Sequence, residues 1–183
     1  MHLKEAEFYN NLGVDESNNG FGFSTDNIKN FPAIYSAVFS NFPEDLATGK
    51  KMHKKRGRHK GLEKVLNKRH YTYLLLEKKD YVLIEPYKRP GLIIGSLIYQ
   101  EPIEPPLTIY FDGEWDFQSI DFIKGFTHEI TNLEKDLIEI KTGADLDKKI
   151  PLVNIADEAA HWLLNRPLKY LRESPNRRSL IRC

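Results

Sequence analysis

Cysteine is nearly absent from this chain of 183 residues: its single cysteine, Cys183, is the last residue. No internal disulfide can form, so the fold depends on a buried core for its stability. The absence of disulfides is compatible with a reducing compartment. A cysteine nucleophile is also disfavoured, because the single cysteine, Cys183, is the last residue. The histidines His53, His59 and His70 have neither paired cysteines nor the spacing of metal ligands, so we expect no zinc site.

Long apolar runs are also missing. No segment approaches the roughly 20 consecutive apolar residues that span a bilayer, and residues 1–7 carry acids where a signal peptide would be apolar. We therefore expect a cytoplasmic protein with no membrane association. Because 40% of the residues are hydrophobic and 29% are charged, we expect a single globular domain over residues 1–183.

The motifs of two common enzyme classes are lacking. Gly20-Phe21-Gly22-Phe23 does not end in the Lys-Ser/Thr of a phosphate-binding loop. No nucleophile elbow marks a Ser-His-Asp set. Phosphate-loop hydrolysis of nucleotides and serine hydrolase chemistry are therefore both disfavoured.

Net charge is only +1, but positive charge is concentrated in an insertion around residues 50–70, where ten Lys and Arg residues stand against the single acid Glu63. Such a run repels itself unless it is solvated or lies against a polyanion, so we expect a nucleic acid as partner. A solvated loop with no ligand is the alternative. A second, weaker basic patch, the C-terminal tail, contains Arg172, Arg177, Arg178 and Arg182. The residues expected to contact phosphates are Lys54, Lys55, Arg56, Arg58 and Lys60.

The order of apolar patterns indicates alternating strands and helices. Residues 81–100 are ambiguous, because prolines and glycines interrupt their helical spacing. Residues 135–141 indicate a marginal strand. The remaining expected elements are strands at 11–17, 33–39, 71–77 and 107–111, and helices at 58–68, 117–130 and 151–164.

Carboxylates stand where apolar segments end, and also inside one apolar segment. Asp15 and Glu16 follow a short apolar run, Asp112 follows residues 107–111, and Asp157 lies within the apolar residues 153–164. Acids are costly in such positions unless a cation lies between them. Carboxylates from three separate elements can converge on Mg²⁺ or Mn²⁺, which prefer oxygen ligands.

Each acid also has a simpler interpretation. Glu16 neighbours Asp15 on a strand and so points to the opposite face, unless a bulge or the strand end turns it. Asp157 can be a solvent-facing residue of an amphipathic helix, with Glu158 on a different side and His161 on the same side. Asp145 and Asp147 flank a loop that can approach the other acids.

Three short motifs resemble those of ribonuclease H-like proteins. The residues from Gly13 to Gly20 resemble the Asp-Glu opening of type 2 ribonucleases H, and equally the Asp-Glu-Ser opening of uncharacterised prokaryotic ribonuclease H-like proteins. Tyr110-Phe111-Asp112-Gly113 is similar to the central Asp-Gly of that superfamily, and Ile155-Ala156-Asp157 to the Ala-Asp of the uncharacterised group. The resemblance implies an α/β fold of the ribonuclease H-like class, with a central mixed five-stranded sheet flanked by helices.

The resemblance also implies a chemistry. Asp15 would bridge two divalent ions, with Asp112 and Asp157 completing the metal sites and Glu16 as a fourth catalytic acid, for hydrolysis of phosphodiester bonds in RNA, DNA or a hybrid. Where type 2 enzymes continue with Gly-Arg-Gly, this chain has Asn18, Asn19 and Gly20, so selectivity for RNA is not implied. A nucleic-acid-binding protein of the same fold without cleavage, and a domain that binds an acidic protein, remain as alternatives.

Overall fold

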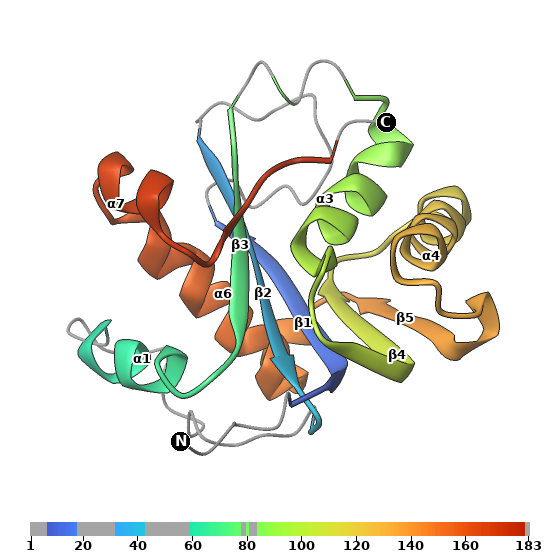
Figure 1. Cartoon of the computed structure of the whole chain (residues 1–183), viewed down its shortest axis with the longest axis horizontal. Coiled ribbons are helices and arrows are strands. Elements are labelled where there is room, and N and C mark those ends of the chain that lie inside the picture. The colour runs from blue at the N-terminus through green and yellow to red at the C-terminus, as the bar shows by residue number, and fades with distance from the viewer. Residues whose placement is uncertain (1–6, 18–31, 43–58, 78–79, 81–83, 182–183) are drawn as a thin grey trace.

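The computed structural model describes residues 7–17, 32–42, 59–77, 80 and 84–181, and Figure 1 shows their arrangement. The elements in chain order are β1 Tyr9–Ser17, β2 Ala33–Ser40, α1 His59–Leu66, β3 Tyr71–Leu76, η2 Pro86–Lys88, α3 Arg89–Ile98, β4 Ile103–Asp112, α4 Phe117–Thr131, η3 Lys135–Leu137, β5 Ile138–Gly143, α5 Leu146–Lys149, α6 Pro151–Leu164, α7 Leu168–Glu173 and β6 Arg177–Arg178.

A mixed sheet forms the centre of the molecule, with strand order β5-β4-β1-β2-β3-β6. β1, β2 and β3 are antiparallel neighbours, whereas β4 runs parallel to β1 and β5 runs parallel to β4. Six strands pair in the described part of the chain, so the expected number of five was wrong. The sixth strand is only two residues long, Arg177–Arg178, which is too short to show an alternating pattern in the sequence.

Helices cover both faces of the sheet. Leu12 and Val14 of β1 belong to the core on the side of α3 and α4, together with Ile93 and Ile123 of those helices. On the other face α1, α6 and α7 pack against side chains such as Ile34 of β2. In Figure 1, α6 passes behind β2 and β3, whereas α3 and α4 lie side by side at the right. Because side chains alternate along a strand, β2 and β3 contribute to both cores, whereas β1 and β4 contribute buried apolar side chains to the core under α3 and α4.

The ambiguous region resolves into a short 3₁₀ turn, η2, and the buried helix α3. Pro90 lies in the first turn of α3, where its missing N–H costs no hydrogen bond. Gly91 and Gly95 give α4 room, because a Cβ at either position would lie 2.4 Å from the ring of Phe122 or Phe126. The prolines and glycines that obscured this helix in the sequence therefore serve its packing.

Most other expected elements match the structure within a few residues. The marginal strand begins later than expected, because Lys135–Leu137 winds into η3 before β5 starts at Ile138. The basic helix is α1, which begins at His59. Arg58 and the residues that join β1 to β2 lie outside the described residues.

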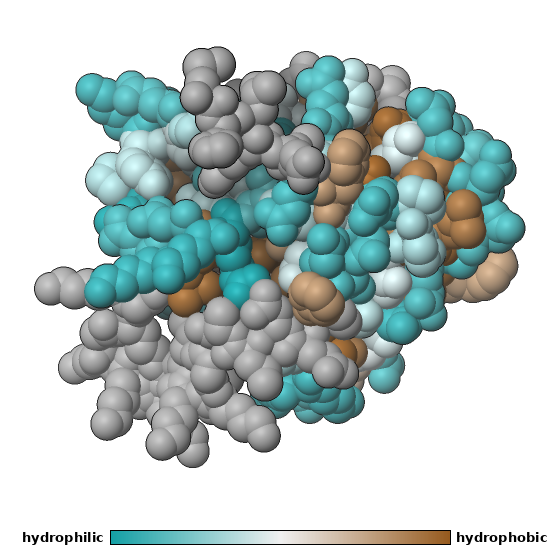
Figure 2. Space-filling view, turned by 60° about the horizontal axis from the view of Figure 1, so that its bottom comes forward, coloured by the Kyte–Doolittle hydropathy of each residue, from teal (hydrophilic) through white to brown (hydrophobic). Residues whose placement is uncertain are grey.

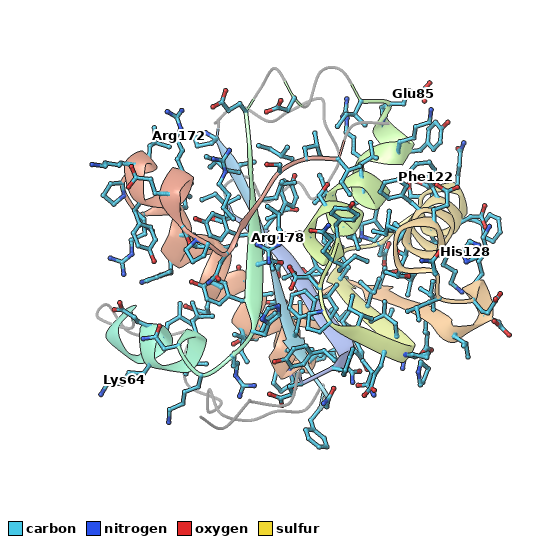
Figure 3. The ribbon with its side chains drawn as sticks, viewed as in Figure 1. Lys64, Glu85, Phe122, His128, Arg172 and Arg178 are labelled. Carbon is cyan, nitrogen blue, oxygen red and sulfur yellow. The ribbon has the colours of Figure 1, made fainter. Side chains whose placement is uncertain are left out.

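The last described residues run along the edge of β3 that faces away from β2, and then on toward α3 (Figure 1). Tyr73 N donates to the carbonyl of Asn176, and Ile181 N donates to Ser96 Oγ of α3 at 2.9 Å. Arg178, labelled near the centre of Figure 3, donates through Nε to Glu101 Oε1 at 2.6 Å, and His70 also binds that carboxylate. This segment therefore ties β3, α3 and the start of β4 together.

The described residues on the face in Figure 2 are predominantly polar. On the part of the face in Figure 2 that is not drawn in grey, hydrophilic residues surround small groups of apolar ones. Among the described residues no helix combines the length and the apolar character that crossing a membrane would require.

Candidate active site

Asp15 and Asp112 lie at the same edge of the sheet because their strands are parallel neighbours. The register pairs Val14 of β1 with Phe111 of β4, so the next residue of each strand is one of these acids. Val14 and Phe111 face the core under α3. Asp15 and Asp112 therefore point to the opposite face of the sheet, which α6 covers.

Gly13 allows α6 to approach this face closely. A Cβ at Gly13 would lie only 2.5 Å from the carbonyl oxygen of Leu152, in the first turn of α6. Only glycine permits this contact between a strand and a helix backbone. The glycine two residues before Asp15 thus sets the height of α6 above the acids.

A buried hydrogen bond fixes where α6 lies along the sheet. Ser36 is the cross-strand partner of Asp15 in β2, and its hydroxyl donates to the carbonyl of Ala156 at 2.6 Å. The residue after Ala156 is Asp157. Ser36 therefore brings the third acid of the candidate site, which lies more than 140 positions from Asp15 in the sequence, beside Asp15.

The pKa of Asp15 responds to the charges of the three other candidate acids. Burial is the largest cause that raises the pKa of Asp15 to about 9, and the negative charge of Asp157 is the next. The charges of Glu16 and Asp112 raise this pKa further, whereas the hydrogen bond from Glu16 N to Asp15 Oδ1, at 2.7 Å, lowers it. Without a cation, Asp15 is therefore protonated at neutral pH.

Asp112 is held by the short helix that precedes α6. Leu146 N donates to Asp112 Oδ1 at 2.5 Å, which uses one oxygen of that carboxylate. Lys148 of the same helix pairs with exposed Asp145, and this hydrogen bond is the largest cause that raises the pKa of Lys148, with a smaller contribution from the charge of Asp112. Asp145, one of the two loop acids weighed from the sequence, thus pairs with a lysine at the surface.

Glu16 lies on the other side of β1 from Asp15. The pairing of β1 with β2 continues without interruption from Asn11 to Ser17, so no bulge turns Glu16 toward the face of Asp15. Its charge still reaches Asp15. A catalytic role for Glu16 remains a prediction, and it would act from the edge of the site.

The side chains expected to contact phosphate are not among the described ones. Lys54, Lys55, Arg56 and Arg58 lie outside the described residues, and Lys60 is described only as part of the backbone of α1. Their role therefore remains a prediction. On α6, His161 is exposed and Glu158 is partly buried.

Two residues that position the acids were missed from the sequence. A glycine inside an apolar strand signals a close backbone approach, so Gly13 was detectable in principle. Ser36 had no such signal, because one serine in an apolar strand does not reveal a partner 120 positions away.

The arrangement is not yet a metal coordination sphere. Within the described ranges, no three His, Cys, Asp or Glu side chains are gathered closely enough to hold an ion. The donor chemistry nevertheless fits Mg²⁺ or Mn²⁺, because a partly buried carboxylate repelled by three others is stabilised by a hard cation. The side chains would have to turn toward one another to bind it.

The sheet order and the helices on both faces form an α/β fold of the ribonuclease H-like class, as its likeness to two solved structures shows. Ribonuclease H2 from Pyrococcus horikoshii OT3 is similar, with a TM-score of 0.64 and 17% identity over 90% of this chain and 76% of the other. The PCNA:RNase HII complex from Archaeoglobus fulgidus contains a chain with a TM-score of 0.60 and 17% identity, over 89% of this chain and 75% of the other. No protein-family model and no curated protein matches the sequence. The expected resemblance to type 2 ribonucleases H is thus confirmed as a likeness of fold.

Proposed function

We propose that the protein is a divalent-metal-dependent nuclease that hydrolyses phosphodiester bonds of RNA, DNA or an RNA–DNA hybrid. The observation that carries this proposal is the partly buried carboxylate of Asp15, surrounded by the charges of Asp157, Glu16 and Asp112. Such a cluster is unfavourable by itself and becomes favourable around cations. The likeness of fold to two archaeal type 2 ribonucleases H supports the same reaction class.

Asp15, Asp112 and Asp157 would hold Mg²⁺ or Mn²⁺, and Asp15 is the proposed bridging ligand because the charges of both other acids act on it. Two bound ions would activate water and neutralise the scissile phosphate during an in-line displacement. Backbone and side-chain hydrogen bonds of the chain position these acids. Leu146 N orients Asp112, and Ser36 holds the turn of α6 that carries Asp157.

The substrate would be held by cations outside the acid cluster. Lys54, Lys55, Arg56, Arg58 and Lys60 remain the proposed phosphate contacts, since their density of positive charge suits a polyanion. Asn18 and Asn19 stand where type 2 enzymes carry residues that select RNA, so the proposal includes DNA.

A second function, nucleic-acid binding without cleavage, is favoured by one observation. In the part of the chain that the structure describes, the acids are not drawn together around one point. A protein that had lost metal binding would keep the fold and the basic residues, but it would not cleave.

Cleavage of labelled substrates tests the proposal. Purified protein is incubated with single-stranded RNA, single-stranded DNA, duplex DNA and a hybrid, in Mg²⁺, in Mn²⁺ and in EDTA. We expect metal-dependent products from at least one substrate, and a loss of at least about 100-fold in rate for Asp15→Asn and Asp112→Asn, comparable to removing one group that stabilises charge in a transition state.

The matched control is Asp121→Asn, which removes an exposed acid of α4 on the other side of the sheet and should cleave at the wild-type rate. Metal-independent products, or equal rates for Asp15→Asn and wild type, would contradict the proposed site. Binding of nucleic acid with no product in any metal would favour the second function.

A further inference from the structure

A second group of basic residues, which follows residues 50–70 in the sequence, lies at the C-terminal end of α6 and on α7. Residues 166–178 contain five Lys and Arg residues and one acid, Glu173. We define the α7 surface as Arg166, Lys169, Tyr170 and Arg172. Lys169 and Arg172 are exposed, and 44% of the Tyr170 side chain is accessible to solvent.

Aromatic rings hold one of these cations at the surface. The guanidinium carbon of Arg166 lies 4.1 Å from the ring centre of Trp162 and 5.9 Å from that of Tyr170. The two rings are 6.3 Å apart and nearly perpendicular, at 88°. Trp162 is buried at the end of α6, so it fixes the position of Arg166. A guanidinium held in this way loses less conformational entropy when it binds phosphate.

Within the described part of the chain, the ion pair of Arg172 with Glu77 leaves both side chains exposed to solvent. Arg172 Nη2 lies 3.4 Å from Glu77 Oε1, and both side chains are about half exposed. An exposed pair of this kind contributes at most about 1 kcal/mol to stability. Lys169 and Arg172 therefore add positive potential to the surface beyond what the fold needs.

The α7 surface has a defined distance from the candidate site. Asp157 lies in the middle of α6, and Arg166 follows two residues after that helix ends at Leu164. With a rise of about 1.5 Å per residue, the separation along α6 is roughly 10–15 Å. α6 covers the face of the sheet to which Asp15 points, so the acids and the α7 surface belong to the same side of the molecule.

We propose that the α7 surface binds the sugar-phosphate backbone of a nucleic-acid duplex, about three to five base pairs from the phosphate at the acid cluster. The position relative to the cleaved bond rests on the proposed function. The spacing follows from a rise of about 3.4 Å per base pair along each strand. Arg166, Lys169 and Arg172 contact phosphates, and the exposed edge of Tyr170 packs against a sugar.

Salt-dependent binding tests this surface directly. The probe is a fluorescein-labelled hybrid duplex of 20 base pairs, titrated by anisotropy in EDTA between 50 and 200 mM salt so that no cleavage occurs. We expect the double variant Lys169→Ala/Arg172→Ala to weaken binding about tenfold and to reduce the slope of log K against log[salt] by about 2, since each phosphate contact releases about 0.9 counterion.

The control is Lys124→Ala/Lys135→Ala, which removes the same charge from α4 and the turn after it. Figure 3 shows Arg172 at the left of the molecule, and His128 of α4 at the right. We expect the control to bind within twofold of wild type. Arg166→Lys, which keeps the charge but changes the stacked group, should weaken binding by a smaller factor than Arg166→Ala. Thermal unfolding of every variant verifies that it is folded.

Each outcome separates this inference from the proposed function. An unchanged salt slope in Lys169→Ala/Arg172→Ala, with cleavage intact in wild type, overturns the α7 surface and leaves the nuclease standing. A reduced slope with no cleavage by wild type supports the surface and removes the nuclease. If polyglutamate of equal charge competes as well as the duplex does, the surface binds acidic protein and the inference is wrong.

Discussion

At the scale of single residues, Asp15 is the most informative side chain in the molecule. Its unfolded pKa lies near 3.9, and burial together with the charge of Asp157 raises the pKa to about 9 in the folded protein. Between these values the unfolded chain loses a proton that the folded protein keeps. Without metal, the free energy of unfolding therefore falls as pH rises from about 4 to about 9.

Asp15→Asn should remove this pH dependence. In EDTA at pH 8 we expect the variant to be more stable than wild type by at least about 1 kcal/mol, which raises Tm by about 2–4 °C. Millimolar Mn²⁺ should raise Tm of wild type by mass action but not that of the variant. Thermal unfolding from pH 5 to 9, with Asp121→Asn as the control, measures both effects. A lower Tm for Asp15→Asn at pH 8 would contradict the account.

Gly13 is the second decisive residue, because its missing side chain lets α6 approach β1. Gly13→Ala should destabilise the fold by about 1–3 kcal/mol, since the added methyl meets the backbone of Leu152 rather than a flexible side chain. Gly125→Ala is the matched control. A Cβ there would meet only Lys135 Nζ at 3.7 Å, so the change should be neutral or stabilising by up to about 1 kcal/mol. Urea unfolding compares the two, and equal effects would show that the close contact is unimportant.

At the scale of elements, the ends of the strands could be predicted from the sequence and the placement of α6 could not. Asp15 and Asp112 each follow an apolar run, and parallel neighbours bring such ends to one edge. The position of α6 on the sheet depends on the hydrogen bond from Ser36 Oγ to the carbonyl of Ala156, and these residues are 120 positions apart. Gly91 and Gly95 interrupt the helical pattern of α3 in the sequence, but in the structure they allow close contact with Phe122 and Phe126 of α4.

Removing the hydrogen bond from Ser36 tests whether it positions α6. Ser36→Ala should lower stability by about 1 kcal/mol and should also reduce the gain in Tm from Mn²⁺, because Asp157 loses its anchor. Thr72→Val is the comparison. Thr72 Oγ1 donates to the carbonyl of Leu97 on the α3 side, so its loss should cost similar stability but leave the response to Mn²⁺ unchanged. Identical Mn²⁺ responses in both variants would refute the role of Ser36.

At the scale of the whole molecule, one buried carboxylate joins segments far apart in the chain. Only 3% of the Glu101 side chain is accessible, and it binds His70 and Arg178. Burial acts to raise the pKa of Glu101, but the hydrogen bonds from these two residues outweigh it and hold the pKa below its ordinary value. The stability from this cluster is therefore present above about pH 4.3 and is lost as pH falls through the lower folded pKa.

Glu101→Gln should remove the charge and weaken the cluster. We expect a loss of about 3 kcal/mol at pH 7, at the lower end of the range for breaking a buried ion pair, and a smaller further loss on acidification than in wild type. Glu104→Gln, an exposed change in β4, should have no measurable effect. Denaturant unfolding between pH 3.5 and 7 makes the comparison, and a variant as acid-sensitive as wild type would exclude Glu101 as the titrating group.

The pairing of β6 with β3 also bears on how the chain is made. Tyr71–Leu76 is an apolar, β-prone segment, and among the described residues Arg177 and Arg178 pair with its outer backbone edge at Tyr73 and Leu74. Without Arg177–Arg178 this part of the edge is open, and an open apolar edge is a template for aggregation. A chain stopped after Glu173 should sediment in the insoluble fraction, whereas the whole chain should not. The two-residue strand contributes little binding area, but it covers a part of the edge that could otherwise pair with another copy of the chain.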